Sequence, residues 1–289
     1  MKDSLFVKLA RLLPDKPYLS LKFYKEFGRF PNWKNPQTFN EKLQWLKLYN
    51  RRPEYTMMVD KYAVKEWVDS KIGGEYVIPT LGVWDRPEEI EWEKLPNQFV
   101  LKTTHGGGNE GVVICRDKAS FDKERSISRL NKNLRTDLYT VWREWPYKNV
   151  RKRIIVEAYM EDESGRELKD YKFFCFGGCP QFIQLDFDRF TEHKKNLYSL
   201  DWELLPFEFN YPRHPEYLFP KPQGLNKMIE VARKLSKGIP FVRVDLYNVN
   251  GKIYVGELTF FPAGGMGKFQ PEEWDKKFGD MLILPEDIK

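Results

Sequence analysis

The sequence predicts an α+β protein in which a helical N-terminal segment precedes two β-rich lobes with a cleft between them. Apolar residues recur at helical spacing up to Ile72, short β-branched runs begin near Tyr76, and a polar helical stretch separates these runs from a second group. Helices segregated from strands in this way favour α+β over an alternating α/β chain. We expect a helical segment at 1–55, lobes at about 56–155 and 156–270, and a tail at 271–289.

Composition narrows the class of protein. The chain has 289 residues and three cysteines without a C-x-x-C pair, which argues against a disulfide framework or a zinc knuckle and favours a reducing compartment. No apolar run reaches the ~18 residues of a spanning helix and no signal-peptide core is present, so a cytoplasmic protein is expected. The net charge of +6 suits an anionic substrate or an acidic membrane surface. No basic block accompanies a nucleic-acid-binding module, so nucleic acid is not an expected partner.

The first helices are predicted from spacing and caps. "LFVKLARLLPDKPYLSLKFYKEFGRFP" mixes apolar and basic residues at helical spacing, with breaks expected at Pro14 and Pro17. This segment either packs on the domain or lies on an anionic membrane. "TFNEKLQWLKLYN" opens with a capping box of Thr38 and Glu41. "DKYAVKEWVDSKIGG" is predicted to begin at the N-cap Asp60 and to end at the glycine pair.

The strands follow from β-branched and aromatic runs. "YVIPTLGVW", "FVLKTT" and "GVVICR" come first, and a helix is expected over about 121–143. Strands return with "RIIVEAYM", "DYKFFCFGG" and "PQFIQLDFD". The helix "LNKMIEVARKLSKG" then precedes the last two strands, "FVRVDLYNV" and "KIYVGELTFF".

The stretch "QFVLKTTHGGGNEGVVI" contains more glycine than a turn requires. It reads as strand, glycine loop and strand, with Lys102 at the end of the first strand. Glycine lets backbone N–H groups approach an oxyanion closely, so the loop and the lysine predict a flap over phosphates. It is neither a Walker loop, because no G-K-[ST] follows, nor a dinucleotide loop, because a strand follows instead of a helix. A hairpin loop without a ligand is the alternative. His105 is expected to shape the loop rather than to take part in catalysis.

The stretch "VRVDLYNVNGKIYVGELTFF" predicts a hairpin with one polar face. Arg243 and Asp245 share a face of the first strand, and Glu257 and Thr259 share a face of the second. A two-residue loop would put Asp245 and Glu257 on opposite faces. We therefore predict a three-residue loop from Val249 to Gly251, which places Arg243 opposite Glu257. Two carboxylates on one face suit Mg²⁺, and an adjacent arginine suits an oxyanion. A surface ion pair is the alternative reading.

The order of these pieces resembles the ATP-grasp superfamily, and within it the TupA-like amidoligase branch, which acts in teichuronopeptide biosynthesis. The resemblance runs from about Pro36 to Phe269 and is most specific in "FNEKLQWLK", "DKYAVKEWV", "FVLKTTHGGGNEG", "DYKFFCFGG" and "GELTFFPAGG". It implies the ATP-grasp fold, with residues 56–270 as the catalytic region and the nucleotide in the cleft between the lobes.

The resemblance also implies roles for individual residues. Lys61 and Lys102 match the phosphate-contacting lysines, and Arg243 matches the arginine that steadies the reacting oxyanion. Asp245 and Glu257 match the magnesium carboxylates, and Thr259 stands where many ATP-grasp enzymes have a metal-binding asparagine. Lys102 and Arg243 are thus the expected catalytic residues. The other residues expected at the nucleotide are His105, Gly106, Gly107, Gly108, Asn109 and Gly111 in the flap, Glu157, Tyr159 and Met160 at the adenine, Asp170 at the ribose, and Lys172.

The function that the resemblance implies is an ADP-forming carboxylate–amine ligase with ATP and Mg²⁺. It would phosphorylate a carboxylate and let an amine attack the acyl phosphate. The expected partners are a sugar-acid acceptor and an amine donor for a cell-surface polysaccharide, at the inner face of the membrane, with Arg189 and His193 near the acceptor. Three alternatives remain: a glycosyltransferase with Asp186 and Asp188 as a D-x-D motif, a sugar kinase on the ATP-grasp fold, and a binding module that has lost catalysis.

Overall fold

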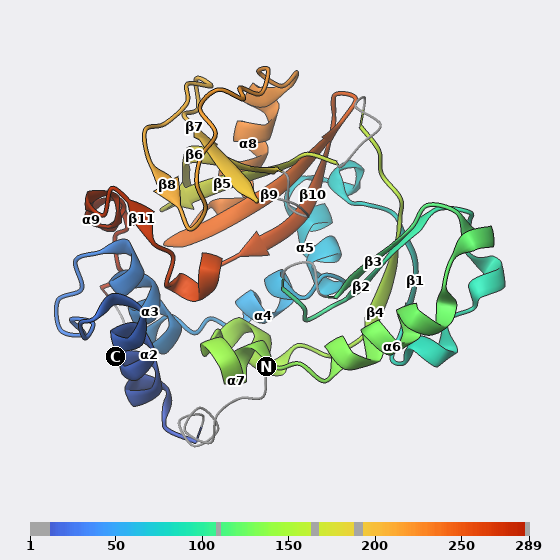
Figure 1. Cartoon of the computed structure of the whole chain (residues 1–289), viewed down its shortest axis with the longest axis horizontal. Helices are drawn as coiled ribbons and strands as arrows, with labels where there is room; N and C mark the ends of the chain where they lie inside the picture. Colours follow the sequence, from blue (N-terminus) through green and yellow to red (C-terminus); the bar gives the residue numbers. More distant parts are fainter. Residues whose placement is uncertain (1–11, 108–110, 163–167, 188–192, 287–289) are drawn as a thin grey trace.

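The computed structural model describes residues 12–107, 111–162, 168–187 and 193–286. Figure 1 shows a smaller β-sheet with its helices, a larger sheet, and a helical N-terminal segment beside them. The predicted α+β class is confirmed. In the part of the chain that is described, no helix is both long and apolar enough to cross a membrane.

The N-terminal helices are α2 (Asp15–Phe27), α3 (Phe39–Tyr49), α4 (Glu54–Val59) and α5 (Ala63–Ile72). The predicted capping box of α3 is present. Pro17 does not break α2, because a proline is tolerated within the first turn of a helix. Helix α5 begins at Ala63 rather than at Asp60. The Asp60 carboxylate nevertheless accepts hydrogen bonds from the backbone N–H groups of Tyr62 and Ala63.

The first lobe is a four-stranded antiparallel sheet in the order β1-β4-β2-β3. Its strands are β1 (Thr80–Trp84), β2 (Phe99–Thr103), β3 (Val112–Cys115) and β4 (Ile154–Ala158). One face packs through Phe99, Leu101 and Val156 onto Leu130 of α6 (Lys123–Leu134). The single helix predicted over about 121–143 is wrong. Asp137 caps a separate α7 (Leu138–Trp142), and η5 (Trp145–Asn149) follows it.

The second lobe is a five-stranded antiparallel sheet in the order β10-β9-β5-β6-β7. The strands are β5 (Asp170–Phe176), β6 (Cys179–Phe187), β7 (Lys194–Tyr198), β9 (Phe241–Val249) and β10 (Lys252–Thr259). Helix α8 (Leu225–Ser236) covers the apolar face and contributes Met228 and Leu235 to the main core. β8 (Glu208–Phe209) pairs with β11 (Phe269–Gln270), and α9 (Glu273–Met281) brings Phe278 into the same core.

The β9–β10 hairpin corrects the predicted loop. Val249 pairs with Lys252, so the loop has two residues, Asn250 and Gly251. Both have positive φ, 53° and 86°, as a type I′ turn requires. A bulge between Val255 and Glu257 then shifts the register by one residue.

This bulge restores the shared polar face. Glu257 pairs with Asp245 and Thr259 pairs with Arg243, so the predicted pairing of Arg243 with Glu257 is wrong. All four side chains nevertheless lie on one face of the sheet, as expected. The bulge residue, Gly256, lies against Tyr247: a Cβ there would be 2.9 Å from the Tyr247 ring.

Candidate active site

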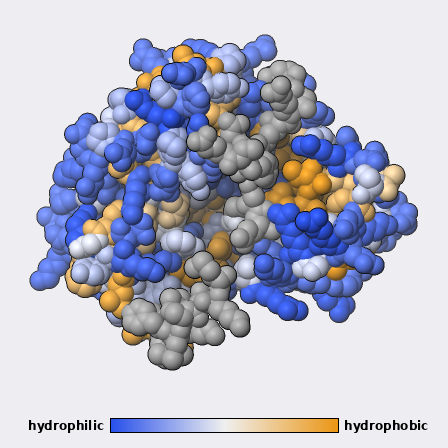
Figure 2. Space-filling view, viewed as in Figure 1, coloured by the Kyte–Doolittle hydropathy of each residue, from blue (hydrophilic) through white to orange (hydrophobic). Residues whose placement is uncertain are grey.

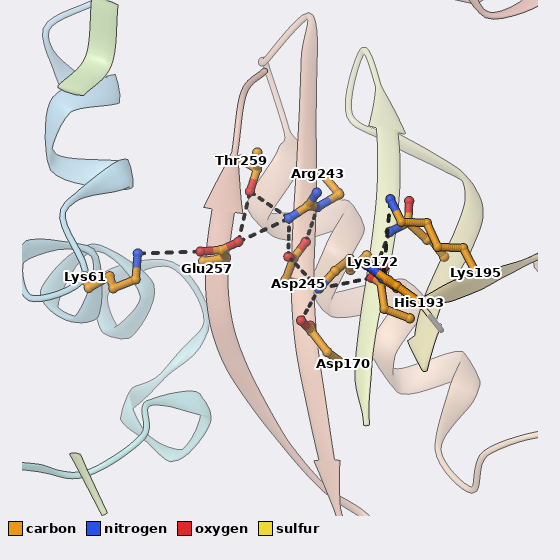
Figure 3. Close-up of polar contacts among 11 residues, drawn as sticks. Lys61, Asp170, Lys172, His193, Lys195, Arg243, Asp245, Glu257 and Thr259 are labelled. Carbon is orange, nitrogen blue, oxygen red and sulfur yellow. Dashed lines mark hydrogen bonds and ion pairs between the residues drawn. The ribbon is translucent and has the colours of Figure 1, made fainter. Parts of the chain in front are cut away.

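Arg243 is the centre of the polar face of the second sheet (Figure 3). Its Nε and Nη2 donate to Asp245 Oδ1 and Oδ2 at 2.6 and 2.5 Å. The same Nη2 donates to Glu257 Oε1 at 3.1 Å and to Thr259 Oγ1 at 3.0 Å. A guanidinium makes such a planar, multiply bonded contact and an ammonium does not. The arginine therefore fixes the positions of all three side chains that were expected to hold a metal.

The two carboxylates differ in their environment. Asp245 is 1% exposed, and burial raises its pKa against the opposing charges of Arg243 and Lys172. Glu257 is one-third exposed. Burial alone would raise the pKa of Glu257, but the charges of Lys61, Arg243 and Lys172 lower it to about 2. Glu257 is thus ionised at every physiological pH.

Lys61 connects the two lobes. It lies between α4 and α5, and its Nζ is 3.6 Å from Glu257 Oε2 on the second sheet (Figure 3). The same Nζ donates to the backbone carbonyl of Gly106 in the glycine loop of the first lobe. One lysine therefore contacts both the predicted phosphate flap and a predicted metal carboxylate.

Lys102 and Glu157 belong to a second ionic group, on the first sheet. Glu157 Oε2 is 2.6 Å from Lys102 Nζ, and Glu157 Oε1 is 2.5 Å from Lys65 Nζ. Burial opposes ionisation of Glu157, but the two lysines outweigh it and lower its pKa. Sequence reasoning missed Lys65, although its spacing of one helical turn from Lys61 was a usable signal. Tyr159 and Met160, expected at the adenine with Glu157, follow β4 and are half-buried.

The glycine loop is packed at its base. Cβ atoms on Gly106 and Gly111 would each lie 2.6 Å from Thr103 Oγ1, so both positions require glycine for packing alone. Gly107 has more room, with its nearest neighbour 3.4 Å away. Gly108 and Asn109 lie outside the described residues. His105 is buried, and burial with the charge of Lys152 lowers its pKa to about 4, so its ring is neutral near pH 7.

Lys172 extends the charge network across the sheet. Its Nζ contacts Asp170, lies 3.4 Å from Asp245 Oδ2 and lies 3.7 Å from Asp186 Oδ2. Burial would lower the pKa of Lys172, but the carboxylates outweigh it and raise the pKa. Asp170, expected at a ribose, is therefore engaged by this lysine.

Asp186 has a histidine and a lysine close to its other oxygen. His193 Nε2 lies 2.8 Å from Asp186 Oδ1, and Lys195 Nζ lies 3.8 Å from the same oxygen. Lys195 was missed because β7 was not predicted. Asp188 and Arg189 lie outside the described residues. Asp186, one of the two aspartates of the D-x-D interpretation, is therefore part of the ionic network of this sheet.

The donor set fits a divalent cation that is shared with a phosphate. Within the described ranges, no group of three His, Cys, Asp or Glu residues is arranged to hold a metal. Asp245 and Glu257 supply two carboxylates on adjacent strands. Mg²⁺ is commonly held by one or two carboxylates together with substrate phosphates and water. These residues therefore suit Mg²⁺ that arrives with a nucleotide.

Two β-rich lobes, with a lysine and a glycine loop on one and an R-x-D/G-E-x-T hairpin on the other, define an ATP-grasp protein. The model of the family described as TupA-like ATPgrasp matches residues 41–283. The chain belongs to this family, as the sequence predicted. No curated protein sequence matches the chain.

Several solved structures are similar at low identity. D-alanine–D-alanine ligase from Helicobacter pylori is 14% identical, with a TM-score of 0.45 over 85% of this chain and 69% of that protein. The ADP complex of N5-carboxyaminoimidazole ribonucleotide synthetase is 16% identical, with a TM-score of 0.47 over 76% of this chain and 50% of that protein. The ATP complex of the Bacillus anthracis D-alanine–D-alanine ligase is 16% identical, with a TM-score of 0.41 over 71% of this chain. The chain spans 54% of that ligase.

Proposed function

We propose that the protein is an ATP-dependent, ADP-forming carboxylate–amine ligase that forms an amide on a sugar acid in cell-surface polysaccharide synthesis. The observation that carries this proposal is Lys61, which joins the glycine loop of one lobe to Glu257 on the other. Membership of the TupA-like ATP-grasp family supports the ligase chemistry. The sugar acid and the amine are inferred from the sequence resemblance to the amidoligase branch.

In this proposal the nucleotide lies between the sheets. Val100 and Ile114 pair across β2 and β3 on the same face as Lys102, and Ile114 is 48% exposed. Figure 2 shows a hydrophobic patch on this lobe. An apolar surface bordered by Lys102 suits an adenine ring with a phosphate chain. Lys61, Lys102 and the loop N–H groups would hold the phosphates.

The second lobe would position the reacting groups. Asp245 and Glu257 would hold Mg²⁺, which neutralises phosphate charge when it is bound. Arg243 is already oriented by these carboxylates, so its positive charge costs little reorganisation when a negative charge develops on the substrate carboxyl group. The acid would be activated as an acyl phosphate, and the amine would displace inorganic phosphate from it. Among the residues described, this route requires no covalent enzyme nucleophile.

Nucleotide binding gives a prediction for Lys102. Mg-ATP at about 100 times its Kd stabilises a folded protein by about 2.7 kcal/mol, so it should raise the Tm of the wild type clearly. Lys102→Ala should lose most of this rise in Tm. The substitution removes one of the cations that would contact the phosphates, and it leaves Glu157 with one lysine partner instead of two. The matched control is Lys94→Ala, whose side chain is 76% exposed. Stabilisation by a UDP-sugar, without a response to Mg-ATP, would contradict the proposal and favour the glycosyltransferase.

We also propose that the N-terminal segment contacts the inner face of the cell membrane. Leu21, Tyr24 and Phe30 are 42%, 50% and 59% exposed on and just after α2, next to the exposed Lys25. Apolar and basic side chains together suit an anionic bilayer surface. The protein should cosediment with vesicles rich in phosphatidylglycerol but not with neutral vesicles, and Leu21→Glu should weaken this binding. Equal binding of the wild type and the Leu21→Glu variant to anionic and neutral vesicles would contradict the proposal.

A further inference from the structure

A row of polar side chains crosses four strands of the second sheet at one level. The strand register pairs Glu257 of β10 with Asp245 of β9. Asp245 in turn pairs with Lys172 of β5, and Lys172 pairs with Gln184 of β6. Side chains that are paired directly across strands lie on the same face of a sheet. Gln184 is therefore on the face that carries the predicted metal carboxylates, with one lysine between it and Asp245.

Gln184 has a buried hydrogen-bond acceptor without a partner. The residue is 1% exposed, and its amide nitrogen donates to Asp186 Oδ2 at 2.9 Å. Its Oε1 is buried and has no hydrogen-bond partner among the residues that the structure describes. A buried acceptor without a donor destabilises a folded protein, so buried polar atoms of this kind require an explanation. A bound ligand that donates a hydrogen bond to Oε1 would supply one.

Asp186 continues the same face toward the edge of the sheet. Its Oδ2 is 3.7 Å from Lys172 Nζ, and its Oδ1 is 2.8 Å from His193 Nε2. Lys172 Nζ is also 3.4 Å from Asp245 Oδ2, so one ammonium group lies close to both Asp186 and the predicted metal site. Figure 3 shows His193 beside Lys172 on this side of the sheet.

An exposed aromatic ring lies at the outer end of this face. Tyr211 follows β8 and is 40% exposed, and the centroid of its ring is 3.9 Å from that of His193. Lys195 Nζ lies 4.7 Å from the Tyr211 ring centroid and 3.8 Å from Asp186 Oδ1. The side chain of His193 is 25% exposed. Polar and aromatic groups are thus continuous from the buried Gln184 to the surface of the protein.

We propose that the sugar acid binds along this face, with its carboxyl group at Arg243 and its hydroxylated ring over Gln184 and Asp186. The inference rests on the proposed ligase function and assigns residues to the sugar end of its acid substrate. An amide oxygen, a carboxylate and an imidazole can accept or donate hydrogen bonds to several hydroxyl groups. The exposed Tyr211 ring offers an apolar surface to the C–H groups of the sugar, as aromatic side chains do in small-molecule sites.

The spacing of the strands suits a single sugar ring. In the sheet order β10-β9-β5-β6, β6 is the second strand from β9, which carries Arg243. Neighbouring strands lie about 4.8 Å apart, so two spacings separate β6 from β9 by about 10 Å. One pyranose ring with its carboxyl group spans this interval. The far end of the ring would then lie toward His193 and Tyr211, where a larger glycan could leave the site.

This arrangement should select acids that carry hydroxyl groups. A site that hydrogen-bonds a substrate hydroxyl rejects the analogue that lacks it, because the buried polar group of the protein then stays unpaired. Gln184 Oε1 is such a group. The ribose of ATP also carries hydroxyl groups, and a ribose on this face would make nucleotide binding depend on the same residues. Binding of the acid and binding of the nucleotide are therefore measured separately.

The experiment compares sugar acids with an analogue that has no hydroxyl groups. D-Glucuronate, D-galacturonate or tetrahydropyran-2-carboxylate is titrated calorimetrically into the protein saturated with Mg-ADP. ADP release from Mg-ATP is followed with each acid and hydroxylamine. The wild type should bind one sugar acid more tightly than the analogue. Gln184→Met, which keeps the length of the side chain, should weaken binding of that sugar acid about tenfold. It should leave binding of the analogue and of Mg-ATP unchanged.

Two further positions make the result decisive. Tyr211→Ala changes only the exposed end of the face and should also weaken binding of the sugar acid about tenfold. Tyr211→Phe should bind it as the wild type does, because the ring is retained. Gln98→Met replaces an exposed glutamine of the first lobe, is the matched control for Gln184→Met, and should behave as the wild type.

Three outcomes would overturn the inference. The first is that the wild type binds neither sugar acid, or binds them no more tightly than the analogue. The second is unchanged binding of the sugar acid in both Gln184→Met and Tyr211→Ala. The third is weaker binding of Mg-ATP with unchanged binding of the sugar acid, which would assign this face to the ribose. If a sugar acid binds as expected but supports no ADP release, the ligase chemistry fails while the sugar site stands.

Discussion

Replacing Arg243 by lysine is expected to lower kcat by about 100-fold while leaving the KM for ATP nearly unchanged. The positive charge is retained, but an ammonium group cannot reproduce the bonds of the guanidinium to Asp245, Glu257 and Thr259. Loss of one preorganised donor at a developing oxyanion typically costs about 10²–10³ in rate. Steady-state ADP release with the best carboxylate measures the effect.

The matched control is Arg233→Lys, because Arg233 is exposed on α8, on the opposite face of the sheet. This control should keep the wild-type rate. An Arg243→Lys enzyme within about threefold of the wild type would mean that the arginine supplies only charge. The ordered arrangement of its three partners would then have no role in the reaction.

Replacing Lys172 by methionine is expected to destabilise the protein by about 3–5 kcal/mol near pH 8. The substitution leaves Asp170, Asp186 and Asp245 facing one another without the cation that lies among them. The loss should be smaller near pH 5. Burial raises the pKa of Asp245 and Lys172 opposes that rise. In the variant the folded state therefore holds a proton on Asp245 more tightly than the unfolded state does, so its stability falls as pH rises. Urea unfolding at the two pH values measures the difference.

The control for Lys172 is Lys234→Met, which removes a lysine that is 55% exposed and paired with Glu230. Exposed pairs contribute about 0–1 kcal/mol, so this variant should change stability little at either pH. A Lys172→Met protein that is as stable as the wild type at pH 8 would show that the remaining cations, Arg243 and Lys195, compensate these carboxylates.

The β9–β10 hairpin illustrates how far the sequence could be interpreted. Alternation along each strand correctly put Arg243 with Asp245 and Glu257 with Thr259. The turn was misjudged because Asn250-Gly251 alone should have indicated a two-residue loop, and Gly256 inside a strand was a recognisable sign of a bulge. The two errors cancelled with respect to which face the side chains occupy, because a longer loop and a bulge each shift the register by one residue.

Contacts between distant segments were less accessible from the sequence. The spacing of Lys65 from Lys61 could indicate that the two lysines share a side, but its contact with Glu157 depends on tertiary packing of the helix. The stretch predicted as one helix over about 121–143 is divided at Asp137, and this division depends on capping and packing. Family motifs identify the residues that are expected to contact ATP, whereas a contact such as that of Lys65 depends on the folded structure around it.

The most direct test of the ligase proposal follows an oxygen atom. The carboxylate that supports ADP release is labelled with ¹⁸O in both oxygens, and the products of one turnover are analysed by mass spectrometry. Activation through an acyl phosphate transfers one carboxylate oxygen to phosphate, so inorganic phosphate should carry one ¹⁸O for each amide formed. Unlabelled inorganic phosphate, or a phosphorylated sugar that retains both labels in its carboxylate, would contradict the proposal and favour the kinase alternative.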